Sequence, residues 1–414
     1  MRKVLITGHE TCGLIRDLSC EFRKRKWEVL TIAKTDNFFS SDYDYDQYNF
    51  VEDYLAKHVT RHQGLQFLLS KLYRLVGKVS PWIAQKIDCF LRTSLHHGIE
   101  LYVQVWAGVP FQEELLKDLK RKNVPSIVMM MGSDIRDYNV FVKQFLVEQW
   151  NFDEALNAPG FVEKLGKLRS CEQYATCIHS VPDQMGLALR PYKHLQVPID
   201  LSCYKFEIPA RRVPLVVHAP SRPEVKGTDI IQSVLAGLQA DGVEFELQYV
   251  RDLPHEKMAE LLTNADVVVD ELVFNGPGWL GFEAMASGCA VATRFYMGSP
   301  SIFRPPIWSI DPCNIRERLL TLLQDFGLRQ ELAAAGREYV ERNNTIGQVV
   351  DNLQESVFSK NSFQYDYFPN YLRNTYVPTD ADEMSLLNSY NQKLKNERWY
   401  RKYVGNYERA GLVF

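Results

Sequence analysis

Residues 275–291 have the sequence NGPGWLGFEAMASGCAV, and this stretch decides the predicted fold. It places three glycines before and within a predicted helix over 280–286: Gly276, Gly278 and Gly281. Glycine leaves room where a backbone approaches a ligand closely. The first turn of a helix offers unpaired N–H groups and a positive dipole end to a phosphate. The stretch therefore predicts a phosphate site, although ordinary turn glycines before a helix are an alternative that the spacing leaves open.

A second stretch, 215–235, supplies basic side chains. Its sequence, LVVHAPSRPEVKGTDIIQSVL, predicts a strand, a polar loop and a helix, with Arg222 and Lys226 in the loop. The residues between the two stretches predict a strand, a helix and a strand, and this alternation is typical of a parallel sheet. His218 lies at the end of the first of these strands, where it either faces a ligand site or caps the strand.

Together these motifs resemble the C-terminal half of a family 4 glycosyltransferase of the GT-B fold. That family carries an Arg/Lys-…-Lys-Gly pair after the first strand of its C-terminal domain, and Arg222 and Lys226 match it. It also carries E-G-x-G-(x)4-E-A-M-A-x-G, which the residues from Asn275 to Gly288 match with one departure. Asn275 stands where the family has glutamate, whose carboxylate accepts hydrogen bonds from donor-sugar hydroxyls.

The resemblance implies an α/β chain with two Rossmann-like domains facing across a cleft. It implies transfer of a sugar, with retention of anomeric configuration, from a nucleotide-sugar donor to a glycan, a lipid-linked sugar or another acceptor. Enzymes of this fold neutralise the leaving diphosphate with basic side chains and a helix N-terminus, so neither a metal nor another cofactor is expected. The implied catalytic residues are Asp134, Arg222, Lys226 and Glu283, with Glu283 on the nucleotide ribose. The implied donor-binding residues are Gly8, Gly13, Arg222, Lys226, Asn275, Gly276, Gly278, Trp279, Leu280, Gly281 and Glu283.

The length, net charge and composition of the chain agree with an enzyme of this kind. Its 414 residues predict two domains. The net charge of -3 argues against a nucleic-acid binder, and no apolar run has the roughly 20 residues that a membrane span needs. The N-terminus MRKVLITG has no apolar signal-peptide core, and the eight cysteines lack metal-binding spacing. We therefore expect a cytoplasmic protein.

The N-terminal half begins with a predicted strand over 3–7, a loop and a helix over 14–26. The loop lacks the GxGxxG dinucleotide pattern. In GT-B enzymes the equivalent loop faces the cleft beneath the donor diphosphate, which makes Gly8 and Gly13 candidates, with simple turn glycines as the alternative.

A later strand over 126–131 ends in the sequence GSDIR, where ligands of open α/β sheets bind. The family often has His-Gly-Ser/Thr-Asp at this point, and Met131 occupies the histidine position. Asp134 and Arg136 remain as polar candidates. A helix cap formed by Ser133 or Asp134 is the alternative.

Residues 57–97 form an insertion rich in basic residues. The only acid in this segment is Asp88, against seven basic residues: Lys57, Arg61, Lys71, Arg74, Lys78, Lys86 and Arg92. The leucine spacing predicts two amphipathic helices joined at Ser80-Pro81. Two readings stay open, a helical pair packed on the domain and a basic face resting on an anionic membrane. The second reading places the protein at the inner face of the membrane.

The predicted domains are 1–198 for the acceptor, 199–344 for the nucleotide sugar, and 345–414 for a crossover helix followed by an aromatic extension. Two other functions stay open. A silent sugar-nucleotide binder is suggested by the departures at Asn275 and Met131, and an epimerase or phosphorylase would share the fold. Hydrolysis of a nucleotide sugar separates an enzyme from a binder.

Overall fold

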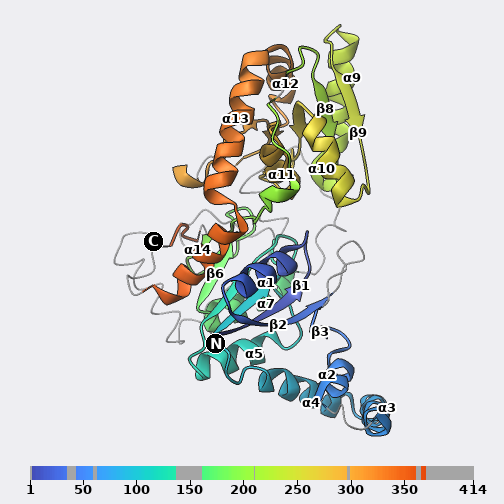
Figure 1. Ribbon diagram of the computed structural model, residues 1–414, viewed down its shortest axis with the longest axis vertical. Coiled ribbons are helices and arrows are strands. Elements are labelled where there is room, and N and C mark those ends of the chain that lie inside the picture. Colours follow the sequence, from blue (N-terminus) through green and yellow to red (C-terminus); the bar gives the residue numbers. More distant parts are fainter. Residues whose placement is uncertain are drawn as a thin grey trace, which may run out of the picture. The chain divides into compact units, whose positions relative to one another are not determined.

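A computed structural model describes residues 2–34, 43–58, 63–136, 161–208, 210–295, 299–359 and 365–369. The chain divides into two compact units, Met1–Leu195 with Asn352–Phe414 and Gln196–Asp351. Each unit is built around its own parallel sheet (Figure 1). Arg61 and the chain beyond residue 369, which includes most of the predicted C-terminal extension, lie outside the described residues.

The first unit contains a seven-stranded sheet in the order β3-β2-β1-β4-β5-β6-β7, and all neighbouring pairs are parallel. Its strands are β1 (Lys3–His9), β2 (Glu28–Lys34), β3 (Tyr45–Asp46), β4 (Leu101–Val105), β5 (Ser126–Met129), β6 (Cys177–Ser180) and β7 (Lys193–His194). The central strands are buried apolar runs, as a sheet covered on both faces requires. The helices α1 (Leu14–Lys24), α5 (Gln112–Arg121) and α7 (Phe161–Tyr174) belong to this unit.

Three further helices lie between β3 and β4 in the chain: α2 (Phe50–His58), α3 (Gln63–Val79) and α4 (Pro81–Ser94). The predicted pair of helices joined at Ser80-Pro81 is confirmed as α3 and α4. Pro81 begins α4 because a proline at the first helical position sacrifices no hydrogen bond. The buried guanidinium of Arg92 fixes α4 to the unit, since it donates to the Gln47 carbonyl at 2.6 Å. It also donates to Asp88 Oδ1 within the helix at 2.7 Å.

The second unit contains a five-stranded parallel sheet in the order β12-β11-β10-β8-β9. Its strands are β8 (Leu215–His218), β9 (Glu246–Tyr249), β10 (Val267–Val269), β11 (Ala290–Thr293) and β12 (Trp308–Ser309). Its helices are α8 (Pro223–Lys226), α9 (Thr228–Ala240), α10 (His255–Asn264), α11 (Trp279–Ser287), α12 (Ile315–Gln324) and α13 (Phe326–Asn343), and α14 (Ile346–Phe358) runs from this unit into the first.

The stretch 275–291 lies at the centre of the second unit. All residues from Gly281 to Ser287 are buried, so α11 is covered on every side. Its Met285 packs closely on α13, where a Cβ at Gly336 would approach the Met285 Cγ to 2.9 Å. A helix enclosed in this way has no polar face, which explains the run of small and apolar residues in its sequence.

Two local predictions need correction. From its sequence we predict a short helix over 182–189, and this prediction is wrong, because the segment consists of turns and irregular backbone. Buried charges hold it there: Glu172 Oε1 accepts from the Leu189 amide at 2.6 Å, and Arg190 donates to the Ala175 carbonyl at 2.6 Å. The polar loop predicted around Lys226 is partly helical, since α8 occupies Pro223–Lys226 and ends at Gly227 with a φ of 73°.

No helix among the described residues is long and apolar enough to cross a membrane.

Candidate functional site

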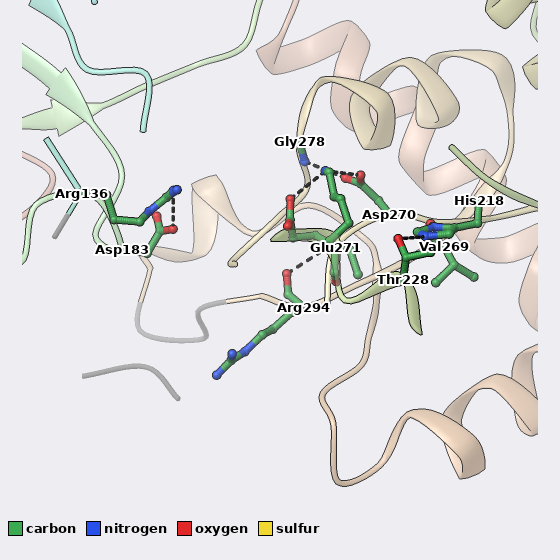
Figure 2. A network of polar contacts seen from close by, with 11 residues as sticks. Arg136, Asp183, His218, Thr228, Val269, Asp270, Glu271, Gly278 and Arg294 are labelled. Carbon is green, nitrogen blue, oxygen red and sulfur yellow. Dashed lines mark hydrogen bonds and ion pairs between the residues drawn. The ribbon is translucent and has the colours of Figure 1, made fainter. Parts of the chain in front are cut away.

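The candidate site of the second unit lies where β10 ends. Asp270 and Glu271 follow its last residue, Val269, and ligands of open α/β sheets bind at such strand ends. The amide of Gly278, the residue that precedes α11, donates to Asp270 Oδ2 at 2.8 Å. Figure 2 shows Asp270 and Glu271 beside Gly278. The glycine loop predicted from the sequence is therefore fastened to the end of the neighbouring strand.

Lys226 lies under the same loop. Its Nζ donates to Asp270 Oδ1 at 2.8 Å and to Glu271 Oε2 at 2.7 Å. Burial alone would lower the pKa of Lys226, but the two carboxylates outweigh burial and raise it well above its ordinary value. The cluster thus holds one formal positive and two formal negative charges. Sequence reasoning selected Lys226 but missed Asp270 and Glu271, although two acids directly after an apolar strand were a visible signal.

Contacts within the protein account for the glycines of this loop. A Cβ at Gly281 would lie 2.5 Å from Pro277 Cβ and 2.9 Å from Asp270 Oδ2, and one at Gly276 would collide with Thr293 Oγ1. A Cβ at Gly278 would approach Lys226 Nζ to 3.3 Å. At Gly276 and Gly281 the loop therefore needs glycine to pack on its own surroundings, one of the two explanations that the sequence leaves open.

Asn275 begins the loop with an unsatisfied amide. Its Nδ2 is buried and has no hydrogen-bond partner among the described residues. The next amide, at Gly276, donates to the Arg294 carbonyl at 2.8 Å, which ties the loop to the end of β11. A buried donor without an acceptor costs about 1–3 kcal/mol, so a ligand oxygen at this point would recover that cost.

The two residues that begin α11, Trp279 and Leu280, are half-buried and pack on the hydrophobic core of the second unit. With Gly281 they form the first turn of the helix, whose backbone N–H groups have no intrahelical acceptor. None of these three amides has a hydrogen-bond partner among the described residues. The first turn of α11 therefore has donors that could bind an anion.

Arg222 differs from Lys226 although both flank α8. It is exposed, and its side chain makes no hydrogen bond or ion pair with any other described residue. Its backbone carbonyl accepts from the Lys226 amide at 3.2 Å. Arg222 is thus a cation available to a ligand, whereas Lys226 already has two carboxylate partners.

Glu283 lies one turn into α11 and is buried. Its Oε1 is 3.4 Å from His255 Nε2 on α10, and the same nitrogen is 2.8 Å from the Tyr204 hydroxyl. The predicted ribose-binding carboxylate therefore has a histidine neighbour that sequence reasoning missed. No local spacing signals this contact, because Tyr204, His255 and Glu283 come from three separate segments.

His218 neither stands open to a ligand nor simply caps a strand. Its Nδ1 is 2.7 Å from the Val269 carbonyl and its Nε2 is 2.9 Å from the Thr228 hydroxyl (Figure 2). A carbonyl only accepts, so Nδ1 carries the proton. Burial lowers the pKa of His218 and favours this neutral form. The ring links β8, β10 and α9.

In the first unit, the backbone requires glycine at both predicted positions. Gly8 has a φ of 139°, and a Cβ there would collide with the Val105 carbonyl of β4. Gly13 has a φ of 80° and precedes α1. The amides at the start of α1 are already engaged by Glu10, whose carboxylate accepts from Thr11, Ile15 and Arg16 at 2.8, 3.2 and 3.1 Å. Sequence reasoning missed this acid.

Asp134 holds two loops of the first unit together. Its carboxylate accepts from the amides of Ala107, Gly132 and Met131 at 2.7, 2.8 and 3.2 Å. Burial raises the pKa of Asp134, and these amides act in the opposite direction. Arg136 donates to Asp183 Oδ2 at 2.8 Å (Figure 2). Both polar candidates of this strand end thus have partners within the unit.

No protein-family model and no curated protein matches the chain. Solved structures do. The sucrose-phosphate synthase of Thermosynechococcus elongatus covers 86% of this chain and 98% of its own, with a TM-score of 0.54 and 14% identity. A Staphylococcus aureus (S. aureus) TarM mutant was solved in complex with fondaparinux, alpha-GlcNAc-glycerol and UDP. The match covers 87% of this chain and 100% of the TarM chain, with a TM-score of 0.55 and 9% identity.

A UDP-forming trehalose-phosphate synthase from Burkholderia xenovorans covers 88% of this chain and 100% of its own, with a TM-score of 0.52 and 11% identity. These proteins are GT-B glycosyltransferases, and each matches over almost its full length. Identities this low establish architecture alone. Together with two parallel α/β sheets in two units, they show that the chain has the GT-B fold.

Proposed function

We propose that this chain is an enzyme that transfers a sugar from a nucleotide-sugar donor to an acceptor with retention of anomeric configuration. The observation that carries the proposal is the polar cluster of Lys226, Asp270 and Gly278 at the strand ends of the second sheet. Ligands of open α/β sheets bind at such ends. The motif match from Arg222 to Gly288 supports the same reaction, as does a fold shared with glycosyltransferases.

In this proposal the donor diphosphate binds Arg222 and the first-turn amides of α11. The bond between the anomeric carbon and a diphosphate oxygen breaks, and its electron pair stays on the diphosphate. The acceptor hydroxyl oxygen bonds to the anomeric carbon, and its proton passes to the departing diphosphate. The Arg222 cation and the helix amides stabilise the charge that develops on that leaving group.

Lys226 adds positive charge from beneath the loop while it holds Asp270 and Glu271. Glu283 is assigned to the nucleotide ribose, a hydroxyl of which would replace its 3.4 Å contact with His255. The amide of Asn275 donates to an oxygen of the donor sugar, because its buried Nδ2 lacks a partner among the described residues. The first unit is assigned to the acceptor, with Asp134 as a residue that shapes its loops.

A uridine diphosphate sugar is the donor to test first, because the TarM mutant was solved in complex with UDP and the trehalose-phosphate synthase is a UDP-forming enzyme. We assign the acceptor to glycans or lipid-linked sugars, and the reaction to the cytoplasmic side of the membrane. Neither a metal nor another cofactor is part of the proposal, since Arg222 and α11 supply the positive charge.

A catalytically silent nucleotide-sugar binder is the second candidate. The observation that favours it is the pair of departures from the family pattern, Asn275 for glutamate and Met131 for histidine. A binder and an enzyme both gain stability from the donor, but only the enzyme breaks the bond to the anomeric carbon.

The test combines thermal unfolding with turnover. UDP, GDP and ADP sugars are added to the full chain, and a ligand at 100 times its Kd should stabilise it by about 2.7 kcal/mol. For each stabilising donor, NMR follows release of the nucleoside diphosphate and the configuration of the product, with and without EDTA. Release with retention and no effect of EDTA supports the proposal. Stabilisation without release identifies a binder, and the absence of both for every donor contradicts the proposal.

A further inference from the structure

The α3–α4 hairpin of the first unit exposes an unusually apolar surface. One stripe of α3 follows a spacing of three and four residues, which places its members on one side of the helix. It consists of Leu68, Leu72, Leu75 and Val79. Their side chains are between 56% and 78% exposed, although leucine and valine in a helix that packs on its domain turn inward. Contiguous exposed apolar residues of this kind mark an interaction surface.

A basic stripe runs directly beside the apolar one. Each of its members precedes a member of the apolar stripe by one residue and is also exposed. They are Phe67 and the basic residues Lys71, Arg74 and Lys78. The Lys71 ammonium lies 4.3 Å from the centre of the Phe67 ring. Arg74 pairs with Glu52 at 3.3 Å, and no described acid pairs with Lys71 or Lys78. The outer side of α3 is therefore half apolar and half cationic.

The second helix of the hairpin repeats this arrangement. Ile83, Ile87 and Phe90 form an exposed stripe on α4, and Phe90 is 70% exposed. Trp82 and Lys86 lie beside them, with the Lys86 ammonium 5.8 Å from the Trp82 ring. The inner sides of the helices meet instead, since a Cβ at Gly77 would lie 3.9 Å from Ala84 Cβ. The exposed stripes therefore take no part in the packing of the two helices against each other.

The charge of the hairpin indicates which kind of partner binds its exposed stripes. Residues 63–97 carry five Lys and Arg against one acid, although the whole chain has a net charge of -3. A second copy of the chain would bring another cationic stripe against the first, and like charges repel. An anionic lipid surface complements both stripes, because headgroups attract the lysines and the acyl boundary accepts leucine, phenylalanine and tryptophan.

We propose that the outer face of the α3–α4 hairpin docks on an anionic lipid bilayer. Lys71, Lys78 and Lys86 contact the headgroups, and the apolar stripes enter the boundary between headgroups and acyl chains. Docking by this face does not depend on the identity of the sugar donor. It also gives the exposed apolar residues of both helices one common partner.

The experiment is flotation of the full chain with vesicles of phosphatidylcholine alone or mixed in equal parts with phosphatidylglycerol. Binding should require phosphatidylglycerol and should fall between 0.1 M and 1 M salt, where the screening length drops from about 10 Å to about 3 Å. Replacing Lys71, Lys78 and Lys86 by Gln should weaken partitioning roughly a hundredfold, since each basic residue contributes about 1 kcal/mol. The matched control replaces three exposed lysines elsewhere, Lys24, Lys117 and Lys257, and should bind as wild type.

The apolar half of the proposal has its own variant, Leu72→Gln with Phe90→Gln. Both side chains are exposed, so the thermal unfolding midpoint should not change, but flotation should be lost. Quenching of tryptophan fluorescence by spin-labelled lipid should decrease in Trp82→Phe. Absence of wild-type flotation at low salt, equal binding to both vesicle types, or unchanged binding of either variant would overturn the proposal. So would a dimer, measured by light scattering, that Leu72→Gln with Phe90→Gln dissociates.

Discussion

The helices α1 and α11 both follow a loop at the carboxyl end of a parallel strand, yet their N-termini differ. At α1, Glu10 accepts hydrogen bonds from the amides of Thr11, Ile15 and Arg16. At α11, Gly278 is the one described residue whose backbone amide donates to Asp270, and it lies before the first turn. The carboxylate of Glu10 thus occupies amides at the start of α1, whereas the amides of Trp279, Leu280 and Gly281 in α11 have no acceptor among the described residues. Helix position alone does not make an anion site, because a nearby carboxylate can fill it.

The largest effect should come from Lys226→Ala, which tests whether the ion cluster holds the open loop. The substitution leaves Asp270 and Glu271 buried without their cation, and breaking a buried pair costs about 3–5 kcal/mol. Urea unfolding measures the loss. Lys257→Ala is the control, since its pair with Glu260 is exposed, is screened by water and should contribute little to stability. Equal losses in both variants would show that the cluster does not support the loop.

A smaller effect is expected from Glu10→Ala, which opens α1. Three amides lose their acceptor, and we expect a loss of about 2 kcal/mol in the free energy of unfolding. Donor affinity should stay within about twofold of wild type, because α1 does not hold the diphosphate in the proposed function. Glu100→Ala, an exposed acid on the same unit, is the control. A variant of full stability that loses donor affinity would reverse the comparison between the two helices.

The smallest effect concerns Asn275 at the edge of the open site. Its unsatisfied Nδ2 favours a donor sugar with an acceptor oxygen at that point. Asn275→Glu replaces the N–H groups of the amide by a carboxylate, which only accepts hydrogen bonds. The preference among sugar donors should therefore shift about tenfold towards sugars with free hydroxyls, in keeping with one hydrogen bond of about 1–3 kcal/mol. Asn275→Asp is a weaker test because its side chain is shorter. Relative rates for a donor panel measure the shift, and an identical ranking would remove Asn275 from contact with the sugar.

Much of the fold was predictable from periodicity. The buried strands β1, β4, β8 and β10 are short apolar runs between turn residues. The sequence also predicts helices over 161–174 and 346–358, and α7 and α14 confirm them. The segment 182–189 was not predictable in this way. Its sequence permits a helix, but hydrogen bonds from its backbone to Glu172 and from Arg190 to the chain hold it in turns. Tertiary contacts of buried charges outweighed local preference.

The site was predictable only in part for the same reason. Sequence patterns located Arg222, Lys226 and the loop before α11, because these residues lie within recognisable local motifs. They did not indicate that Asp270 and Glu271 bind Lys226, more than 40 residues earlier, or that His255 faces Glu283. The glycines illustrate the same limit, since their neighbours Thr293 and Asp270 come from other segments.

Titration calorimetry of UDP against the full chain tests the central claim most directly, that Arg222 and the open end of α11 form the diphosphate site. Wild type should bind UDP, and Arg222→Gln should bind it ten- to a hundredfold more weakly with an unchanged unfolding midpoint, as loss of one charge-assisted hydrogen bond of about 1.5–3 kcal/mol requires. Arg16→Gln, at the closed end of α1, should bind as wild type. Undiminished binding by Arg222→Gln, or a loss confined to Arg16→Gln, would contradict the account.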